Sequence, residues 1–298
     1  MPSVLTLNDL ASDEKADNWF DAEKGVNNSW TFHSICSSCD KKYFADYESP
    51  EVLQQPLTNK MMAEIALKNA LIQLDKRASE IPLYNIMQER KYTFINKEDL
   101  DTMLALDVKD WEFDKKRAKK IIDKNLKSGY RSLYWRKLPY TVPYALQAGI
   151  TLVKDMRGRQ INAIYNFSPD VRMQFLQMAV FPLEGFSIVS VFYHKDDSNY
   201  YAFAREFARL PENEKLDLIN FLAIKYSENL CATPMLSTVI ENNASLLRLF
   251  SEYSESPHLG VCSPEEKMSY TPVVKEEVPN LLSEAYSLEK LGGSHDQL

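Results

Sequence analysis

The sequence predicts an α+β fold: a helix-rich N-terminal half with a zinc knuckle, then an antiparallel meander sheet covered by C-terminal helices. Apolar residues recur at helical spacing between residues 57 and 129, whereas β-rich runs separated by short turns occupy residues 142–193. Short connections between consecutive strands indicate antiparallel pairing, because parallel neighbours need a crossover of a dozen or more residues. The 298 residues, 45% of them apolar, suffice for one large domain or two modest ones.

Three helices are expected in the first half of the chain. Thr58 caps a helix whose apolar positions run almost all round, which is typical of a buried central helix. Asn96 caps the next helix, residues 97–106, and a third helix runs over residues 109–126 and ends before Gly129.

The second half is expected to combine strands with covering helices. The predicted strands are residues 142–153, 160–165, 173–182 and 186–193, and the predicted helices are residues 198–210, 211–226 and 235–253. In the last predicted strand, the residues that point to either face of the sheet are largely apolar, so this strand should be covered on both faces. The chain then divides into an N-terminal segment with the metal knuckle (1–56), a helical region (57–129), a sheet with helices (130–254) and a flexible tail (255–298).

Composition and charge exclude several functional classes. The net charge of −7 argues against a generic polyanion binder, and the longest apolar stretch is far short of the ~20 residues of a membrane helix. Acidic residues stand near the N-terminus where a secretory signal would carry lysine or arginine, so we expect a cytoplasmic protein that does not enter a membrane. Only eight glycines are present, which argues against glycine-rich phosphate loops. The sequence contains no phosphate-loop, dinucleotide-binding, nucleophile-elbow or HExxH motif, so it does not indicate whether the protein is an enzyme.

The most specific chemical feature is a knuckle formed by His33, Cys36 and Cys39, which are evenly spaced by three residues. Zinc prefers thiolate and imidazole ligands in a tetrahedron, so these three residues predict a structural Zn²⁺ site that lacks one ligand. The candidates for the fourth ligand are Cys231, His258 and Cys262. A reduced, simply packed cysteine pair and a redox-active pair remain alternatives.

The knuckle also resembles known proteins. Residues 32–51 look like the Cys-x2-Cys turn that opens the treble clef of HNH-type nucleases, but no second Cys-x2-Cys pair follows and no histidine lies between His33 and His194. More broadly, FHxxCxxCD at residues 32–40 and the Tyr226-Ser-Glu-Asn229 run resemble a group of bacterial proteins. Such proteins often sit among phage-defence genes, so the resemblance implies an antiviral role without implying a mechanism.

A strongly basic segment is the second candidate for function. Residues 113–138 hold ten Lys or Arg and two Asp, a charge of +8 that leaves −15 for the rest of the chain. The lysines share one helix face, and aromatic residues follow them at once, a combination that suits single-stranded nucleic acid. The predicted nucleic-acid-binding residues are Lys116, Lys119, Lys120, Lys124, Lys127, Arg131, Trp135 and Arg136. A solvated helix face, or lysines paired with acids or with a second subunit, is the alternative interpretation.

These observations favour a zinc-knuckle protein that binds nucleic acid or a protein partner, with a role in bacterial phage defence implied by the resemblance. One alternative is a metal-dependent nuclease or other hydrolase with a site assembled from distant residues, for which Asp40, Asp46 and Glu48 are candidate oxygen ligands. Separately, His194 ends a strand beside Asp196 and Asp197 and is a candidate catalytic histidine. Another alternative is a regulatory subunit that forms a homo-oligomer and has no ligand.

Overall fold

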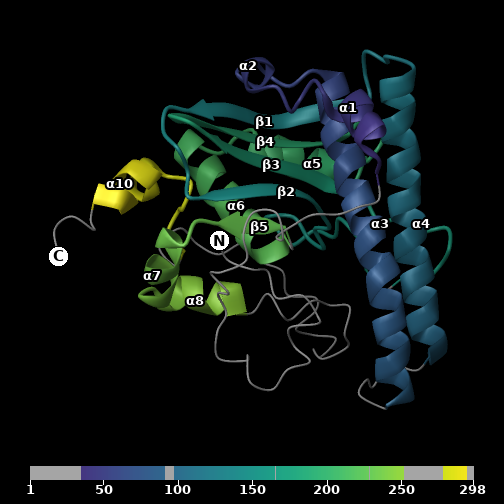
Figure 1. Ribbon diagram of the computed structural model, residues 1–298. Helices are drawn as coiled ribbons and strands as arrows, with labels where there is room; N and C mark the ends of the chain where they lie inside the picture. The colour runs from purple at the N-terminus through teal and green to yellow at the C-terminus, as the bar shows by residue number, and fades with distance from the viewer. Residues whose placement is uncertain (1–34, 91–96, 165, 228, 252–277, 294–298) are drawn as a thin grey trace.

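The computed structural model describes residues 35–90, 97–164, 166–227, 229–251 and 278–293 and confirms the α+β class (Figure 1). A helical layer lies on one face of a five-stranded antiparallel sheet and shorter helices lie on the other. The first layer contains α1 (Ser37–Phe44), α2 (Pro50–Leu53), α3 (Asn59–Glu89) and α4 (Lys97–Asp123). The second contains α5 (Tyr200–Phe207), α6 (Glu212–Tyr226), α7 (Met235–Glu241), α8 (Ala244–Ser251), the 3₁₀ turn η3 (Glu284–Tyr286) and α10 (Leu288–Gly293).

The sheet contains the predicted meander and two further strands at its edges. Its strands, in the spatial order β1-β4-β3-β2-β5, are β1 (Tyr130–Leu138), β4 (Phe186–His194), β3 (Leu176–Leu183), β2 (Tyr144–Ile150) and β5 (Leu230–Ala232). Consecutive strands β2, β3 and β4 pair antiparallel, and the tight β3–β4 turn places Gly185 at φ 76°, which glycine adopts without strain. Strand β4 is buried on both faces, as predicted.

Helices α3 and α4 form a long antiparallel hairpin that packs against the sheet. Small side chains such as Ala63 and Ala70, both fully buried, let α3 approach its neighbours closely. At the sheet, a Cβ on Gly149 would lie 2.8 Å from the Trp111 ring, so only glycine fits under α4 there. Helix α4 is continuous, not two helices as predicted, because residues 107–108 contain no helix breaker. No helix within the described ranges is long and apolar enough to cross a membrane.

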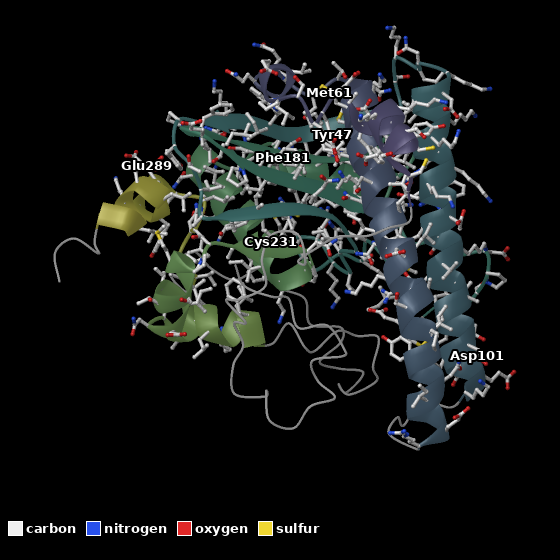
Figure 2. The ribbon with its side chains drawn as sticks, in the orientation of Figure 1. Tyr47, Met61, Asp101, Phe181, Cys231 and Glu289 are labelled. Carbon is white, nitrogen blue, oxygen red and sulfur yellow. The ribbon has the colours of Figure 1, made fainter. Side chains whose placement is uncertain are left out.

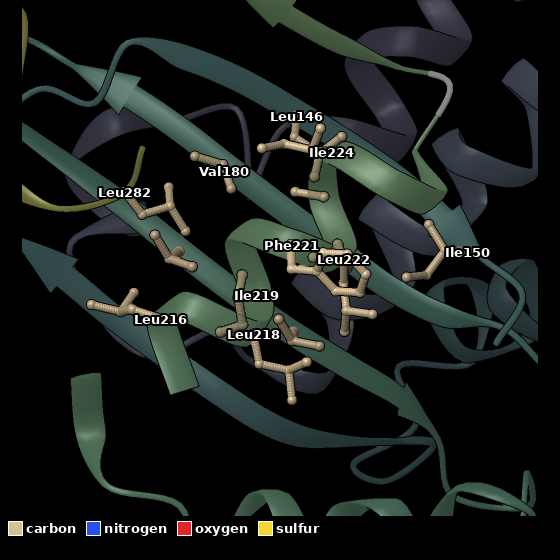
Figure 3. Packing of buried hydrophobic residues seen from close by; sticks show 14 of the residues in the cluster. Leu146, Ile150, Val180, Leu216, Leu218, Ile219, Phe221, Leu222, Ile224 and Leu282 are labelled. Atoms are coloured by element: carbon tan, nitrogen blue, oxygen red, sulfur yellow. The ribbon is translucent and has the colours of Figure 1, made fainter. Parts of the chain in front are cut away.

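The larger core lies between the sheet and α6, as the close view of Leu146, Val180, Ile219 and Leu222 shows (Figure 3). Residues 278–293 belong to this core, because Leu281 and Leu282 are fully buried in it. The prediction of a flexible tail is therefore wrong for residues 278–293, and residues 255–277 lie outside the described part of the chain.

Two other elements differ from their predictions. The strand expected at residues 160–165 is only an isolated bridge between Lys154 and Gln160, because the chain there turns about Asp155. The helix expected over residues 235–253 divides into α7 and α8 at Asn242, where the helical hydrogen bonds stop and Asn243 starts a new turn. Strand β1 was not predicted as a strand, although the predicted sheet region began at its first residue.

Candidate nucleic-acid interface

One face of α4 exposes a row of cations on successive turns. Lys109, Lys116 and Lys120 lie on this face with Phe113 between the first two, and all four side chains are exposed. Lys124 continues the row just past the helix, where its N–H still donates to the carbonyl of Lys120 at 3.2 Å. A rise of 1.5 Å per residue makes this lysine row roughly 22 Å long.

Most of these cations have no acidic partner within the described residues. Lys119, by contrast, forms an ion pair with Asp123, and Lys115 pairs with Glu112. Charges already neutralised in this way contribute little to binding a phosphate. On α4 and in the turn after it, the exposed lysines that form no ion pair with any described residue are Lys109, Lys116, Lys120, Lys124 and Lys127.

Helix α1 extends the basic surface. The amino groups of Lys42 and Lys119 lie 5.0 and 5.1 Å from the centre of the Tyr43 ring, which places α1 beside the last turns of α4 (Figure 1). Lys41 and Lys42 are both exposed on α1. The surface that could meet a phosphate backbone is therefore broader than the basic segment that the sequence indicated.

The predicted binding residues of β1 are more involved in structure than those of α4. Arg131 stacks over the Tyr201 ring at 5.0 Å, and Arg136 forms an ion pair of 3.4 Å with Glu212. Trp135 is half-buried and packs against the core beneath α3, with its indole nitrogen buried. Since its ring belongs to this packing, Trp135 offers little surface for stacking with a base.

A buried charge cluster fastens α4 to the sheet. The guanidinium of Arg117 donates two hydrogen bonds to the carboxylate of Asp197, at 2.7 and 2.5 Å, and one to Asp114 at 3.0 Å. Arg172 donates to the same Asp197 carboxylate at 2.5 Å. Two arginines thus face two aspartates, from α4, the loop before β3 and the turn after β4. Burial, partly offset by Arg117, raises the pKa of Asp114 to about 6.

His194 ends β4 beside this cluster, with its Nδ1 3.7 Å from the carboxylate of Asp196. Burial, followed by the positive charge of Arg117, lowers the pKa of His194 to about 4, so the imidazole is neutral at pH 7. Its Nδ1 accepts the backbone N–H of Asp196 at 3.2 Å. Asp197 is bound to two arginines instead of capping α5, whose N-cap residue makes no side-chain capping bond. The geometry is that of a structural histidine.

A shallow hollow of about 650 Å³ opens beside the lysine row, between α4 and the loop before β3. Phe113 stands at its edge with 48% of its surface exposed, the largest fraction among the exposed large apolar residues in the described part. The guanidinium carbon of Arg172 lies 4.6 Å from the centre of the Phe113 ring. The hollow is lined mainly by Lys109, Phe113, Lys116, Pro169, Asp170 and Arg172.

The cysteine pair lies at the start of α1. Cys36 is the N-cap residue and Cys39 belongs to the first turn, and neither forms a disulfide. The hydroxyl of Ser38, 3.1 Å from the Cys36 sulfur, lowers the pKa of Cys36 to about 7, while the hydrogen bond to Cys36 raises the pKa of Cys39. Two sulfurs on one turn fit two of the four positions around zinc.

The remaining proposed zinc ligands are not brought to this turn by the described residues. His33, His258 and Cys262 lie outside the described part of the chain. Cys231, labelled in Figure 2, lies on the edge strand β5, and the described residues contain no group of three His, Cys, Asp or Glu side chains suited to a metal.

Within the described residues, Asp40, Asp46 and Glu48 do not belong to any group of three or more side chains suited to a metal. Asp46 forms an ion pair with Lys60 at 2.9 Å, and Glu48 forms one with Lys68 at 2.6 Å. Both lysines belong to α3, so these acids fasten the segment after α1 to the helical layer. Tyr47 between them stacks on Phe181 of β3 at 6.0 Å (Figure 2).

Sequence reasoning missed Phe113, Asp114 and Arg172. A signal for the first two was present, because Phe113 is an apolar residue on the lysine face and Asp114 is an acid on the face of Trp111 and Ala118. Nothing local marks Arg172, which meets the cluster only through the fold. Comparisons with protein-family models, with curated proteins and with solved structures find no match to this chain.

Proposed function

We propose that the protein binds nucleic acid through the lysine row of α4, with Lys127 and the lysines of α1 at its C-terminal end. The observation that carries this proposal is a set of exposed lysines on one face that form no ion pair with any acidic residue in the described part of the chain, although the net charge of the protein is −7. Folding has paired other cations of the same segment with acids and left these available. Lysines that release counterions from a phosphate backbone supply affinity without sequence preference.

Reversing two charges of the row should remove most of this affinity. In the double variant Lys120→Glu, Lys124→Glu, two attractive contacts become repulsive, so a fluorescent oligonucleotide should bind at least about tenfold more weakly at 0.1 M salt. The wild type should lose affinity steeply as salt rises. Single Lys→Ala variants should each reduce the slope of log affinity against log salt by about 1. Fluorescence anisotropy measures both quantities.

The matched control changes the same total charge elsewhere. Arg248→Glu with Lys290→Glu alters two exposed cations on α8 and α10, on the other side of the sheet from α4 (Figure 1). This control should bind as the wild type does. If both double variants bound the oligonucleotide equally weakly, the loss of affinity would come from net charge alone, which would contradict a specific interface on α4. Binding of a protein partner in place of nucleic acid would also contradict it. Cleavage with a divalent metal that Asp40→Ala or Asp46→Ala abolishes would instead favour the metal-dependent nuclease.

We infer in addition that Cys36, Cys39 and His33 hold a structural zinc ion with a fourth ligand. The support is the placement of two unpaired thiols on the first turn of α1, beside the basic surface. The ion would fasten α1 and the residues before it, and so hold Lys41 and Lys42 in place. An antiviral role remains a proposal that rests on the resemblance alone.

Metal analysis of the purified protein tests this second proposal. We expect close to one zinc per chain, lost in Cys36→Ser and in Cys39→Ser. If Cys231→Ser also loses the metal, Cys231 is the fourth ligand, whereas retention leaves His258 and Cys262. Protein purified without chelators that contains no zinc would refute the site, and the pair would then be tested as a thiol–disulfide couple.

A further inference from the structure

We propose that the hollow beside Phe113 receives an unstacked nucleobase, so that the protein prefers single-stranded to double-stranded nucleic acid. This inference rests on the proposed function, because it uses the lysine row as the track for the phosphates. To the proposed function it adds the class of nucleic acid that is bound and a contact residue, Phe113, that the charge pattern of the sequence does not identify. Aromatic side chains beside a cationic track are how proteins hold single strands without reading sequence.

Phe113 is an exposed platform that the charge cluster holds in place. The ring is 48% exposed, although burial of an aromatic side chain is favourable. Arg172 stacks over it at 4.6 Å and Arg117 at 5.6 Å. Arg172 is itself fixed by Asp197 and by the carbonyl of Met173, to which it donates at 2.5 and 2.8 Å. A base that stacks on Phe113 therefore meets an aromatic–cation pair that is already in place, so few protein side chains have to be ordered on binding.

The charges around the hollow favour a base over a phosphate. Besides its cations, the hollow is lined by Asp110, Glu112 and Asp170, whose carboxylates would repel a phosphate. Asp110 is buried and accepts the N–H of Met173 at 2.9 Å, so it stays part of the structure. Carboxylate oxygens accept hydrogen bonds from the amino groups of bases. Phosphates are better placed along the row, starting at Lys116 one turn away.

A duplex cannot use this arrangement, because its bases are stacked on one another and paired. Only a strand whose bases are free can lay one of them on Phe113 while its flanking phosphates reach Lys116 and Lys120. The preference for a single strand should therefore depend on the ring of Phe113, while the salt dependence should depend on the lysines. These two properties are separable by substitution.

The test compares a 12-nucleotide single strand with the matching duplex in anisotropy titrations. Phe113→Ala should weaken binding of the single strand about 5- to 150-fold, the range that one stacked base gives, and should leave duplex affinity and the salt slope unchanged. Phe113→Tyr should retain wild-type binding because the aromatic face remains. In an oligonucleotide carrying 2-aminopurine, the wild type should quench the fluorescence by stacking, and Phe113→Ala should quench much less.

Met235→Ala is the control, because Met235 is also a large exposed apolar side chain (39%) but lies on α7. It should bind as the wild type does, and thermal unfolding should show all variants folded. If the wild type binds neither strand form, the proposed function and this inference fall together. If the wild type binds and the lysine variants weaken it, but Phe113→Ala binds the single strand normally, only the base site is refuted. Equal loss of single strand and duplex in Phe113→Ala refutes it as well.

Discussion

Asp197→Ala is expected to destabilise the protein by about 3–5 kcal/mol, the cost of leaving buried arginines without their partner. The Asp197 side chain is completely buried and binds Arg117 through both oxygens. Its removal leaves two guanidinium groups against the single carboxylate of Asp114. The cluster joins α4 to the sheet, so the loss should appear in global unfolding. Urea denaturation at pH 7, followed by circular dichroism, measures it.

The adjacent residue provides the control for this prediction. Asp196 is 73% exposed in its side chain, and its carboxylate lies 3.7 Å from His194 without a strong partner. Asp196→Ala should change the free energy of unfolding by less than about 0.5 kcal/mol. Equal effects of the two alanine variants would show that the cluster does not stabilise the fold.

A charge-balanced variant separates the net contribution of the pair from the cost of breaking it. Arg117→Met with Asp197→Leu removes one charge of each sign and leaves Arg172 facing Asp114, 3.6 Å away. Replacing a buried ion pair by apolar residues of similar volume is often neutral, so this double variant should recover much of the stability lost in Asp197→Ala. Failure to recover would mean that hydrogen bonds to Asp197, and not charge balance, hold the region together.

The sequence sufficed to predict those elements whose pattern is local. The hairpin of β3 and β4 follows from apolar strands about Gly185, and α3 from apolar residues all round the helix. Strand β1 was missed because it carries Arg131, Arg136 and Lys137, which made it continuous with the basic helix before it. An edge strand with cations is a common protection against pairing with other chains.

The candidate site, like the fold, contains features that the sequence predicts and features that only the structure shows. The lysine face of α4 could be predicted because helical spacing places the lysines together. The ion pairs that occupy Lys115 and Lys119 are also local, with Glu112 and Asp123 three and four residues away. The partners of the two arginines could not be predicted, since that of Arg117 lies 80 residues away and that of Arg136 lies 76 residues away. The burial of the Tyr130 and Tyr134 rings follows from β1 lying in the sheet, and it moves the candidate for stacking to Phe113.

Glu64→Gln is expected to make the protein more stable above pH 7. Glu64 is fully buried on α3, where its carboxylate accepts the N–H of Tyr47 at 3.1 Å and lies 3.5 Å from the amino group of Lys60. Burial is the dominant influence and raises the pKa of Glu64 from 4.5 to about 7. The folded state therefore binds more protons than the unfolded state between these two values, so stability falls as the pH rises through this window.

The size of the effect follows from the shift. A pKa difference of one between the folded and unfolded states corresponds to about 1.4 kcal/mol, so a charged Glu64 lowers the free energy of unfolding by about 3 kcal/mol at pH 8. The Gln side chain still accepts the N–H of Tyr47, so the variant should regain about 2–3 kcal/mol. Wild type and variant should converge near pH 4.5. Asp114, whose raised pKa acts in the same direction, and His194, whose lowered pKa makes stability rise between about pH 4 and 6.5, are present in both proteins.

The difference between the two urea-unfolding curves at each pH therefore isolates Glu64. Glu89→Gln, at the exposed end of the same helix, should leave the free energy of unfolding unchanged at every pH. A Glu64→Gln variant that is less stable than the wild type at pH 8 would mean that the ion pair with Lys60 outweighs the cost of burial. In that case the loop between α1 and α2 would be held on α3 by charge, and high salt should release it, whereas hydrogen bonding to a neutral Glu64 would be insensitive to salt.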